Sequence, residues 1–414
     1  MVKPGYKQTE IGIIPKDWTV ANFGSKVKIF RGGSPRPIQD YLTQADDGVN
    51  WIKIGDVREG DKYITSTEEK IIPEGVSRSR TVHAGDFILS NSMSFGRPYI
   101  LNIDGCIHDG WLTIQEYEQT FSKDFLYYLL SSDSVYQQYI SMAAGSSVKN
   151  LNKEKVSALM VAYPEIGEQE KIAEALSCID TLIAYSEKEL AKKKAIKQGA
   201  MQELLTGKKR LPGFSEKWES NKLHKCTERI IVGLATSVTQ YYRERGTVIF
   251  RNLNILPNKL DDRDILYLDP DFANTYPNKK VKANDVLTVH TGYVGISCLV
   301  PPKYEGALTF TTLITTTKKD VLSPAFLVAH LNSPIGTKTI EALQAGGGRN
   351  NLNVSDFEQY ELFFPQDVAE QEAIAEVLSN MDSEIEALEQ KLAKTRQIKQ
   401  GMMQQLLTGK IRLV

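Results

Sequence analysis

The chain has 414 residues, of which 41% are hydrophobic and 24% charged, and its formal net charge is −1. This composition excludes a disordered chain and leaves room for two domains of ordinary size. The near-zero charge gives no basic footprint of the kind that nucleic-acid-binding proteins usually show.

Processing and export signals are missing from the sequence. No run approaches the roughly 18 apolar residues of a membrane span, and no signal-peptide core follows the start. The four cysteines are too far apart for a disulfide scaffold or a zinc cluster. We therefore expect a cytoplasmic protein without a membrane partner.

Residues 1–164 are predicted to form a mixed α/β domain. Runs rich in β-branched or alternating apolar residues indicate strands at 49–57, 62–67, 86–92 and 97–103. Apolar residues at helical spacing predict a short helix over 123–135. Trp18 is expected in the core, and Tyr163-Pro164 is expected to close the domain, because proline disfavours helix at the preceding residue.

A long helix is predicted within residues 165–211. It begins near Glu168 and continues without proline to Leu205, about 38 residues, and Gly207 then supplies a C-terminal stop. Acidic residues near its start and lysines near its end complement the helix dipole.

Residues 212–364 are predicted to form a second mixed α/β domain. Strands are indicated at 247–255, 285–291, 296–300 and 308–317. A short helix is expected over 324–334. Trp218 is expected in this core, and Phe364-Pro365 is expected to end the domain.

Residues 365–414 hold a second long helix that repeats the first. Residues 169–211 and 371–413 are identical at 26 of 43 positions at a constant offset of 202. That offset is far longer than the roughly 20–50 residues of a solenoid repeat. Asn150-Leu151-Asn152 and Asn351-Leu352-Asn353 also correspond, whereas most of the two domains diverges. The chain is thus predicted to be an internal duplication with pseudo-two-fold symmetry.

The two long helices are predicted to pair with each other as an antiparallel coiled coil. A pseudo-two-fold axis relates two surfaces of the same kind, which favours this pairing over packing of each helix on its own domain alone. The expected seam residues recur at spacings of three and four. They are Ile172, Leu176, Ile179, Ile183, Leu190, Ile374, Leu378, Met381, Ile385, Leu388 and Leu392.

The order of parts resembles a known family. A Pro followed by an IAxxLxxxDxxI helix that ends in KQGMMQQLLTGK, preceded by a Gly-x-x-x-Asn-Leu element, resembles the specificity (S) subunit of Type I restriction-modification systems. The resemblance covers the whole chain. It implies that each variable domain reads half of a split DNA target, and that the paired helices set the spacing and dock two modification (methyltransferase) subunits. Restriction (translocase/endonuclease) subunits are further implied partners.

Motifs for catalysis are not found. The sequence has neither the (D/N)PP(Y/F) tetrad of adenine methyltransferases nor a glycine-rich loop suited to S-adenosylmethionine. LLTGKKR departs from a P-loop, because Gln202 stands where its first glycine would be. The five histidines have no metal spacing. A non-catalytic subunit without metal or cofactor is therefore expected.

DNA-reading candidates are side chains that can bind base edges or phosphates and lie on predicted loops. They are Arg31, Ser34, Arg36, Asn91, Ser92, Arg97, Lys149, Asn150, Ser237, Arg243, His290, Thr291, Arg349 and Asn350. For Asn150 and its counterpart Asn351, the alternative is that each caps the short helix that follows.

The sequence leaves two other functions open. One is a fused solitary DNA methyltransferase or nuclease, which the missing motifs disfavour. The other is a coiled-coil scaffold for partners other than DNA. Salt dependence separates the scaffold from the DNA-binding subunit, since DNA affinity falls steeply as salt rises.

Overall fold

The computed structural model describes residues 2–58, 60–91, 96–143, 151–347 and 351–413. The chain forms two compact units, Met1–Ser186 with Lys391–Val414, and Glu187–Gln390. Each unit combines one mixed α/β domain with part of each long helix. The division that we propose from the sequence has four segments, 1–164, 165–211, 212–364 and 365–414. The boundaries of the compact units fall within the two helical segments, 165–211 and 365–414.

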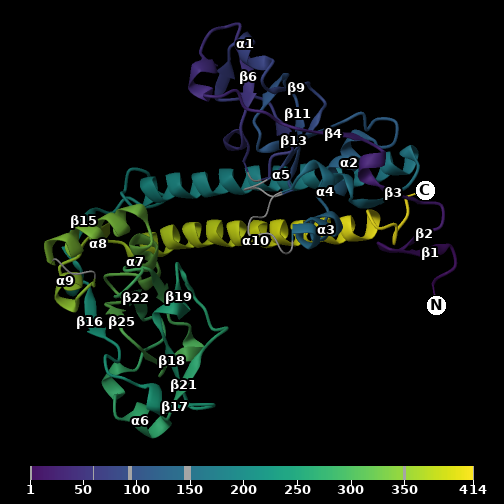
Figure 1. Cartoon of the computed structure of the whole chain (residues 1–414). Coiled ribbons are helices and arrows are strands. Elements are labelled where there is room, and N and C mark those ends of the chain that lie inside the picture. Colours follow the sequence, from purple (N-terminus) through teal and green to yellow (C-terminus); the bar gives the residue numbers. More distant parts are fainter. Residues whose placement is uncertain (1, 59, 92–95, 144–150, 348–350, 414) are drawn as a thin grey trace. The chain divides into compact units, whose positions relative to one another are not determined.

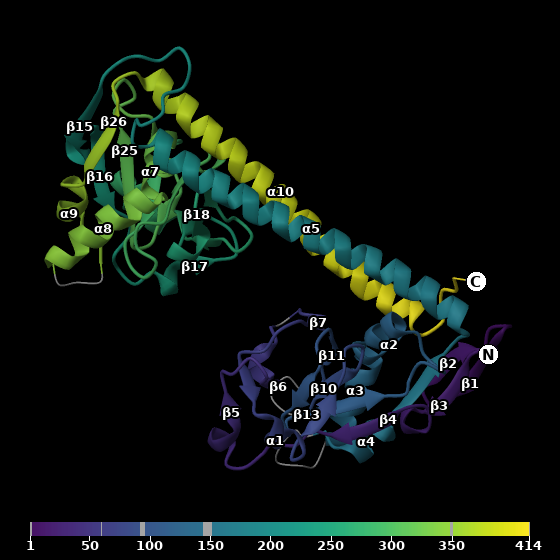
Figure 2. The same cartoon turned by 90° about the horizontal axis from the view of Figure 1, so that it is seen from above.

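The domain of the first unit contains sheets with the strand orders β4-β13-β10-β11-β7 and β5-β8-β6-β12-β9, and the strand pairs β1-β2 and β14-β3 (Figures 1 and 2). The strands are β1 (Tyr6–Thr9), β2 (Gly12–Pro15), β3 (Thr19–Asn22), β4 (Lys28–Arg31), β5 (Leu42–Thr43), β6 (Val49–Ile52), β7 (Tyr63–Ile64), β8 (Glu69–Ile71), β9 (Arg80–Val82), β10 (Phe87–Ser90), β11 (Pro98–Leu101), β12 (Gly105–Ile107), β13 (Trp111–Gln115) and β14 (Met160–Tyr163). The helices of this domain are α1 (Pro73–Val76), α2 (Lys123–Leu130), α3 (Asp133–Ala143) and α4 (Lys153–Ser157).

The domain of the second unit contains sheets with the orders β16-β25-β22-β23 and β17-β21-β18-β24, and the pairs β15-β26 and β19-β20. The strands are β15 (Trp218–Lys222), β16 (Thr227–Val232), β17 (Tyr242–Arg243), β18 (Thr247–Phe250), β19 (Ile255–Leu256), β20 (Lys259–Leu260), β21 (Leu266–Leu268), β22 (Val286–Val289), β23 (Ser297–Leu299), β24 (Leu308–Thr309), β25 (Thr312–Thr317) and β26 (Glu361–Pro365). The helices are α6 (Pro270–Asn274), α7 (Pro324–Leu331), α8 (Pro334–Gly347) and α9 (Val354–Glu358).

The two domains share one central sheet order. β4-β13-β10-β11 in the first corresponds to β16-β25-β22-β23 in the second. β10 pairs antiparallel with β13 as β22 does with β25. The fully buried strands β10 and β22 lie in the middle of each sheet. The duplicated mixed α/β scaffold expected from the sequence is therefore confirmed, although most side chains on it differ.

The predicted short helices are each divided in two. The segment expected to be one helix over 123–135 is α2 followed by α3, and 324–334 is α7 followed by the start of α8. Ser132 accepts a hydrogen bond from the backbone N–H of Val135, and Ser333 accepts one from Gly336. A serine that caps the next helix in this way ends the previous one.

The long helices are α5 (Ile166–Leu204) and α10 (Val368–Leu406), each of 39 residues. In both units their segments lie side by side and antiparallel (Figures 1 and 2). In the first unit Lys399 of α10 pairs with Asp180 of α5 at 2.6 Å. In the second unit Lys193 pairs with Glu384 and Lys194 with Glu389, both at 2.6 Å, so that positive charges of α5 meet negative charges of α10.

The predicted seam residues are all buried or half-buried. The seam residues are most deeply buried where side chains of the domains also pack against them. Ile172 and Leu176 share the core of the first unit with Leu406 and Leu407, and Ile374 shares that of the second. The helices thus pack against each other and also against their own domains. Both arrangements considered from the sequence, helix pairing and packing on the domain, occur together.

An Arg–Glu clamp joins the segment after one helix to the start of the other in each unit. In the first unit Arg412 donates to both carboxylate oxygens of Glu168, at 2.6 and 2.7 Å, and also to Asp17. In the second unit Arg210 donates to both oxygens of Glu370, at 2.5 and 2.6 Å. The Glu168 and Glu370 side chains are 7% and 0% exposed. A bidentate pair fixes the orientation of the arginine relative to the carboxylate as well as their separation. Each clamp therefore sets the position of the segment after one helix relative to the start of the other.

The tryptophans at the domain starts belong to these clamps. The ring of Trp18 lies 5.9 Å from the Arg412 guanidinium, and Trp218 lies at the same distance from Arg210. Trp18 is buried as expected and donates to Glu168 at 3.3 Å. Trp218 is only half-buried, against the expectation of a core position. The hydrogen bond to Arg412 lowers the pKa of Asp17 despite some opposing burial.

His330 of α7 is expected to make the stability of the second domain depend on pH. Its ring is buried, its Nδ1 atom has no hydrogen-bond partner among the described residues, and burial lowers its pKa from 6.5 to about 4. Folding therefore favours the neutral ring. The stabilisation that comes from the neutral His330 ring is fully present above pH 6.5. It is lost as the pH falls from 6.5 towards 4, because the unfolded chain then binds a proton at His330 and the folded chain does not.

We expect His330→Leu to remove this part of the pH dependence. The corresponding residue of the first domain is Leu129, also buried, so leucine suits the site. Between pH 7.5 and 4.5 the wild type should lose up to about 3 kcal/mol more stability than the variant. Urea unfolding at each pH measures this difference. Parallel losses in the two proteins would contradict the assignment to His330.

Candidate nucleic-acid interface

Three segments of the first domain meet at one end of its central sheet. β4 and β10 end there and β13 begins there, with Arg31 opposite Leu112 and Ser90 opposite Trp111. The loop after β10 is closed by a hydrogen bond from Gly96 N–H to the Ser90 carbonyl, and the Leu151 N–H donates to the Asn91 carbonyl. Predicted loops far apart in sequence are thereby brought together.

Asp109 organises this end of the domain. Its carboxylate accepts from Ser34 at 2.9 Å and lies 3.4 Å from Arg36 and 3.0 Å from the ring of His108. Burial alone would raise the pKa of Asp109, but the Ser34 hydrogen bond and the neighbouring charges lower it. The aspartate therefore stays ionised and holds two predicted DNA-reading residues in place.

Arg31 and Asn91 are held by the backbone of the same residue. Arg31 Nε and the Asn91 side-chain amide both donate to the Asp109 carbonyl, at 3.4 and 2.9 Å. Arg31 and Arg36 are exposed, whereas the Asn91 side chain is 4% exposed. In this structure the Asn91 amide is buried and engaged with the backbone, and a role of Asn91 in reading DNA stays a prediction.

The second domain repeats the arrangement with other side chains. Gly295 N–H closes the loop after β22 onto the Val289 carbonyl, and the Leu352 N–H donates to the His290 carbonyl. Asn252 takes a central place. Its amide nitrogen donates to the Thr291 carbonyl, and its amide oxygen accepts from the Thr312 hydroxyl, both at 3.1 Å.

Thr291 is exposed at this sheet end, and it forms an isolated β-bridge with Asn351. His290 is half-buried beside it, and one ring nitrogen lies 3.0 Å from the Leu352 carbonyl. Thr291 thus presents its side chain to solvent, while His290 also secures the loop.

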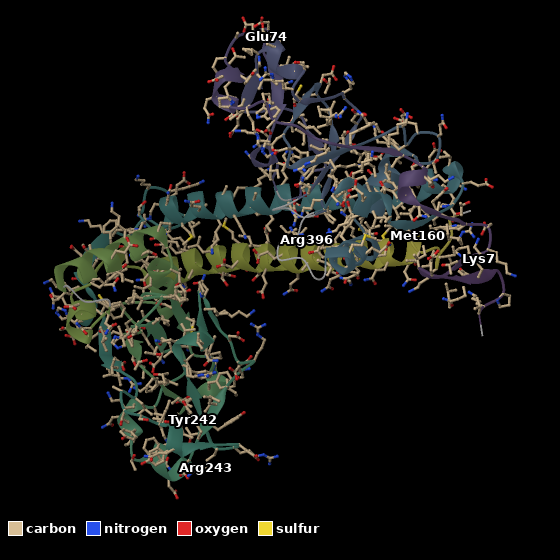
Figure 3. All side chains as sticks on the ribbon, viewed as in Figure 1. Lys7, Glu74, Met160, Tyr242, Arg243 and Arg396 are labelled. Atoms are coloured by element: carbon tan, nitrogen blue, oxygen red, sulfur yellow. The ribbon has the colours of Figure 1, made fainter. Side chains whose placement is uncertain are left out.

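Ser237 and Arg243 lie on another part of the second domain. Arg243 is at the edge strand β17, beside Tyr242 (Figure 3), and its guanidinium donates at 2.9 Å to the carboxylate of Asp269, the N-cap of α6. The Ser237 hydroxyl pairs with that of Thr239. Both are exposed. Arg243 belongs to the second sheet of this domain and Ser237 lies in the loop that leads to it, whereas Thr291 follows β22 of the first sheet.

Other predicted residues are placed less directly. Arg97 is exposed and directly precedes β11, and its backbone N–H donates to the Ser90 hydroxyl at 3.3 Å. Ser92, Lys149, Asn150, Arg349 and Asn350 lie outside the described residues.

The helix caps differ by two residues from those proposed. The N-cap of α4 is Asn152, whose side chain accepts from the Lys155 N–H, and the N-cap of α9 is Asn353. Asn351 lies in the β-bridge with Thr291. The capping alternative was therefore wrong for Asn351, because the helix begins later than expected.

Comparison with protein families gives a match over both halves of the chain. The model of the "Type I restriction modification DNA specificity domain" matches residues 15–195 and 233–397. The chain belongs to this family.

Relatives in the specificity-domain family cover nearly the whole chain. The putative MjaX specificity subunit of Methanocaldococcus jannaschii is 26% identical over 99% of this chain and 97% of its own. The MjaVIII specificity subunit of the same organism is 22% identical over 97% and 94%. A solved Type I restriction-modification S subunit from M. genitalium superposes with a TM-score of 0.59 at 12% identity, over 94% of this chain and 96% of that one. The fold is therefore that of S subunits.

Several features of this specificity-domain chain could not be seen in the sequence. Asp109 and Asn252 lie in segments that sequence analysis assigned no site role, and only the fold shows that they link loops. In the described segments, no group of three or more His, Cys, Asp or Glu side chains could hold a metal ion. Within the same residues, no helix is long and apolar enough to cross a membrane.

Proposed function

We propose that this chain is the DNA sequence-specificity subunit of a Type I restriction-modification complex and is itself non-catalytic. Each domain reads one half of a split double-stranded DNA target. The paired helices fix the distance between the half-sites and bind two modification subunits. Restriction subunits complete the complex, which acts in the cytoplasm.

This proposal rests on one observation: the two domains share the same scaffold but have different residues on their loops. The central sheet order and the loop-closing hydrogen bonds are the same in both domains, yet the exposed residues at the equivalent sheet end differ. Arg31, Ser34 and Arg36 surround Asp109 in the first domain, and Thr291 adjoins Asn252 in the second. Two copies of one frame with different polar loops suit the reading of two different half-sites.

The near-zero net charge of this chain suggests that the modification subunits contribute much of the affinity for DNA. DNA affinity depends largely on neutralised phosphates, and this chain has a formal net charge of −1. We therefore propose that partner subunits supply most of the phosphate contacts, while these loops supply the base contacts.

Exchange of one domain tests the proposal. β3 pairs with β14 from Asn22–Met160 to Thr19–Tyr163, so replacing residues 23–159 with those of another S subunit leaves this pair in place. The expected result is a change in one half-site, with the other half-site and the spacing kept.

Selection from random duplexes in the presence of modification subunits measures the target of each protein. The wild-type chain is the control. If the exchange altered both half-sites, the domains would not read DNA independently, and the proposal would fail.

A further inference from the structure

Two apolar side chains at the interface end of the second domain are unusually open to solvent. Leu253 is 76% exposed and Tyr293 is 83% exposed, more than any other large exposed hydrophobic residue among those described. A single exposed apolar residue is common on protein surfaces and by itself indicates nothing. These two, however, lie on the two loops that Asn252 joins through its hydrogen bond to Thr291.

The turn that carries Leu253 is firmly held on both sides. It is a 3-10 turn over Asn252–Asn254. The Asn254 side chain is buried, accepts from the Arg251 N–H at 2.9 Å, and donates to the carbonyls of Asp261 and Asp264, both at 3.0 Å. Leu253 therefore stands on a fixed turn between two anchored asparagines.

The loop that carries Tyr293 is also constrained. Gly292 and Gly295 adopt φ angles of +88° and +92°, which favour glycine. The Val294 N–H donates to the Gly292 carbonyl, and the Gly295 N–H to the Val289 carbonyl, both at 2.9 Å. A rigid loop keeps a large aromatic side chain in solvent and lowers the entropy cost of burying it against a partner.

We propose that Leu253 and Tyr293 together form an apolar wedge that packs against the bases of the half-site read by the second domain, with Tyr293 stacking on an opened base step. This inference rests on the proposed function. Proteins that kink DNA insert apolar side chains between base steps, and aromatic rings stack on bases regardless of sequence. The polar groups beside the wedge, including exposed Thr291, suit base edges.

The first domain has no counterpart of Leu253. Its equivalent turn is Ile54–Asp56, where Lys53 and Asp56 take the places of Arg251 and Asn254. Gly55 then stands at the position of Leu253, and a Cβ atom there would meet nothing within 4 Å. Among the described residues, the Leu253 part of the wedge is thus found in the second domain alone, and the effects of Leu253 and Tyr293 on DNA should fall on the second half-site.

The test uses the full chain with its modification subunits and the duplex that the wild type selects, with 2-aminopurine placed in turn along both half-sites. We expect Tyr293→Ala to weaken binding roughly 5- to 150-fold, the range for loss of one stacked base. It should also lower the 2-aminopurine fluorescence in the second half-site alone. Leu253→Ala should act in the same direction, and Tyr293→Phe should behave as the wild type, since the ring is kept.

Ile13→Ala, which removes another exposed apolar side chain from β2, is the matched control and should change neither affinity nor fluorescence. Unchanged affinity of the Tyr293→Ala complex would overturn the wedge. Equal losses for Tyr293→Phe and Tyr293→Ala would also overturn it, because the hydroxyl and not the ring would then make the contact.

Light scattering separates a protein contact from a DNA contact. If Tyr293→Ala prevented the modification subunits from binding, the surface would be a protein dock and the wedge would be refuted. If instead the wild-type complex selected no sequence at all, the proposed function itself would fail, which is a distinct result.

Discussion

Replacing Arg412 with alanine is expected to lower the free energy of unfolding of the first unit by about 3–5 kcal/mol, because it leaves a buried carboxylate without its partner. Glu168 is 7% exposed and receives two hydrogen bonds from Arg412. Arg210→Ala should have a similar effect on the second unit, where the Glu370 side chain is fully buried. Denaturant unfolding of each variant gives the loss.

Two further variants identify the cause. Arg263→Ala removes an arginine that is 84% exposed and paired with Asp261, and such surface pairs contribute about 0–1 kcal/mol. Adding Glu168→Gln to Arg412→Ala should restore part of the stability, because the unpaired charge is then gone. If Arg412→Ala lowered the free energy of unfolding no more than Arg263→Ala, the clamp would not contribute to stability.

Residues 1–211 alone are expected to form a homodimer that recognises a palindrome. This half-chain keeps one domain and one long helix, whose seam is left uncovered, and the best available partner is a second copy, since the helix repeats match at 26 of 43 positions. Arg210 of each copy would meet Glu168 of the other, because Glu168 and Glu370 are equivalent residues. Two identical domains related by a two-fold axis should read the first half-site twice, in inverted orientation.

The homodimer should be less stable than the full chain. Ser186 would occupy both places where the full chain has Ser186 and Leu388. Leu388 is half-buried, so its loss should cost part of the roughly 1.5–3 kcal/mol that a fully buried leucine contributes. Light scattering gives the mass, and selection from random duplexes with modification subunits gives the target. A monomer at micromolar concentration, or a target that is not palindromic, would refute the pseudo-two-fold pairing.

The sequence by itself determined the helical repeat and the scaffold. α5 and α10 begin and end at the same offset of 202 residues as the repeat, close to the predicted limits, because long amphipathic helices follow from local periodicity. All eight predicted strand segments also contain strands. Some end early, as at Ile52 and Phe250, where a 3-10 turn follows.

The Arg–Glu clamp is also indicated by the sequence repeat. Arg210 and Arg412 occupy equivalent places in the repeat, as do Glu168 and Glu370, so a shared contact was inferable. The predicted antiparallel pairing places the end of each helix beside the start of the other, so it also indicates that Arg210 meets Glu370 and Arg412 meets Glu168. Only the tertiary structure shows that each contact is bidentate and that the glutamates are buried.

Only the tertiary structure decided which loop residues are available to a ligand. Asn91 and Thr291 looked alike as polar loop residues, but the first is buried against the Asp109 carbonyl and the second is exposed. Leu253 and Tyr293 looked like ordinary apolar residues of a strand and a loop, and their exposure comes from how the ends of β18 and β22 are held. Local pattern fixes the elements, whereas exposure depends on which segments the sheet brings together, and that information lies outside any short stretch of sequence.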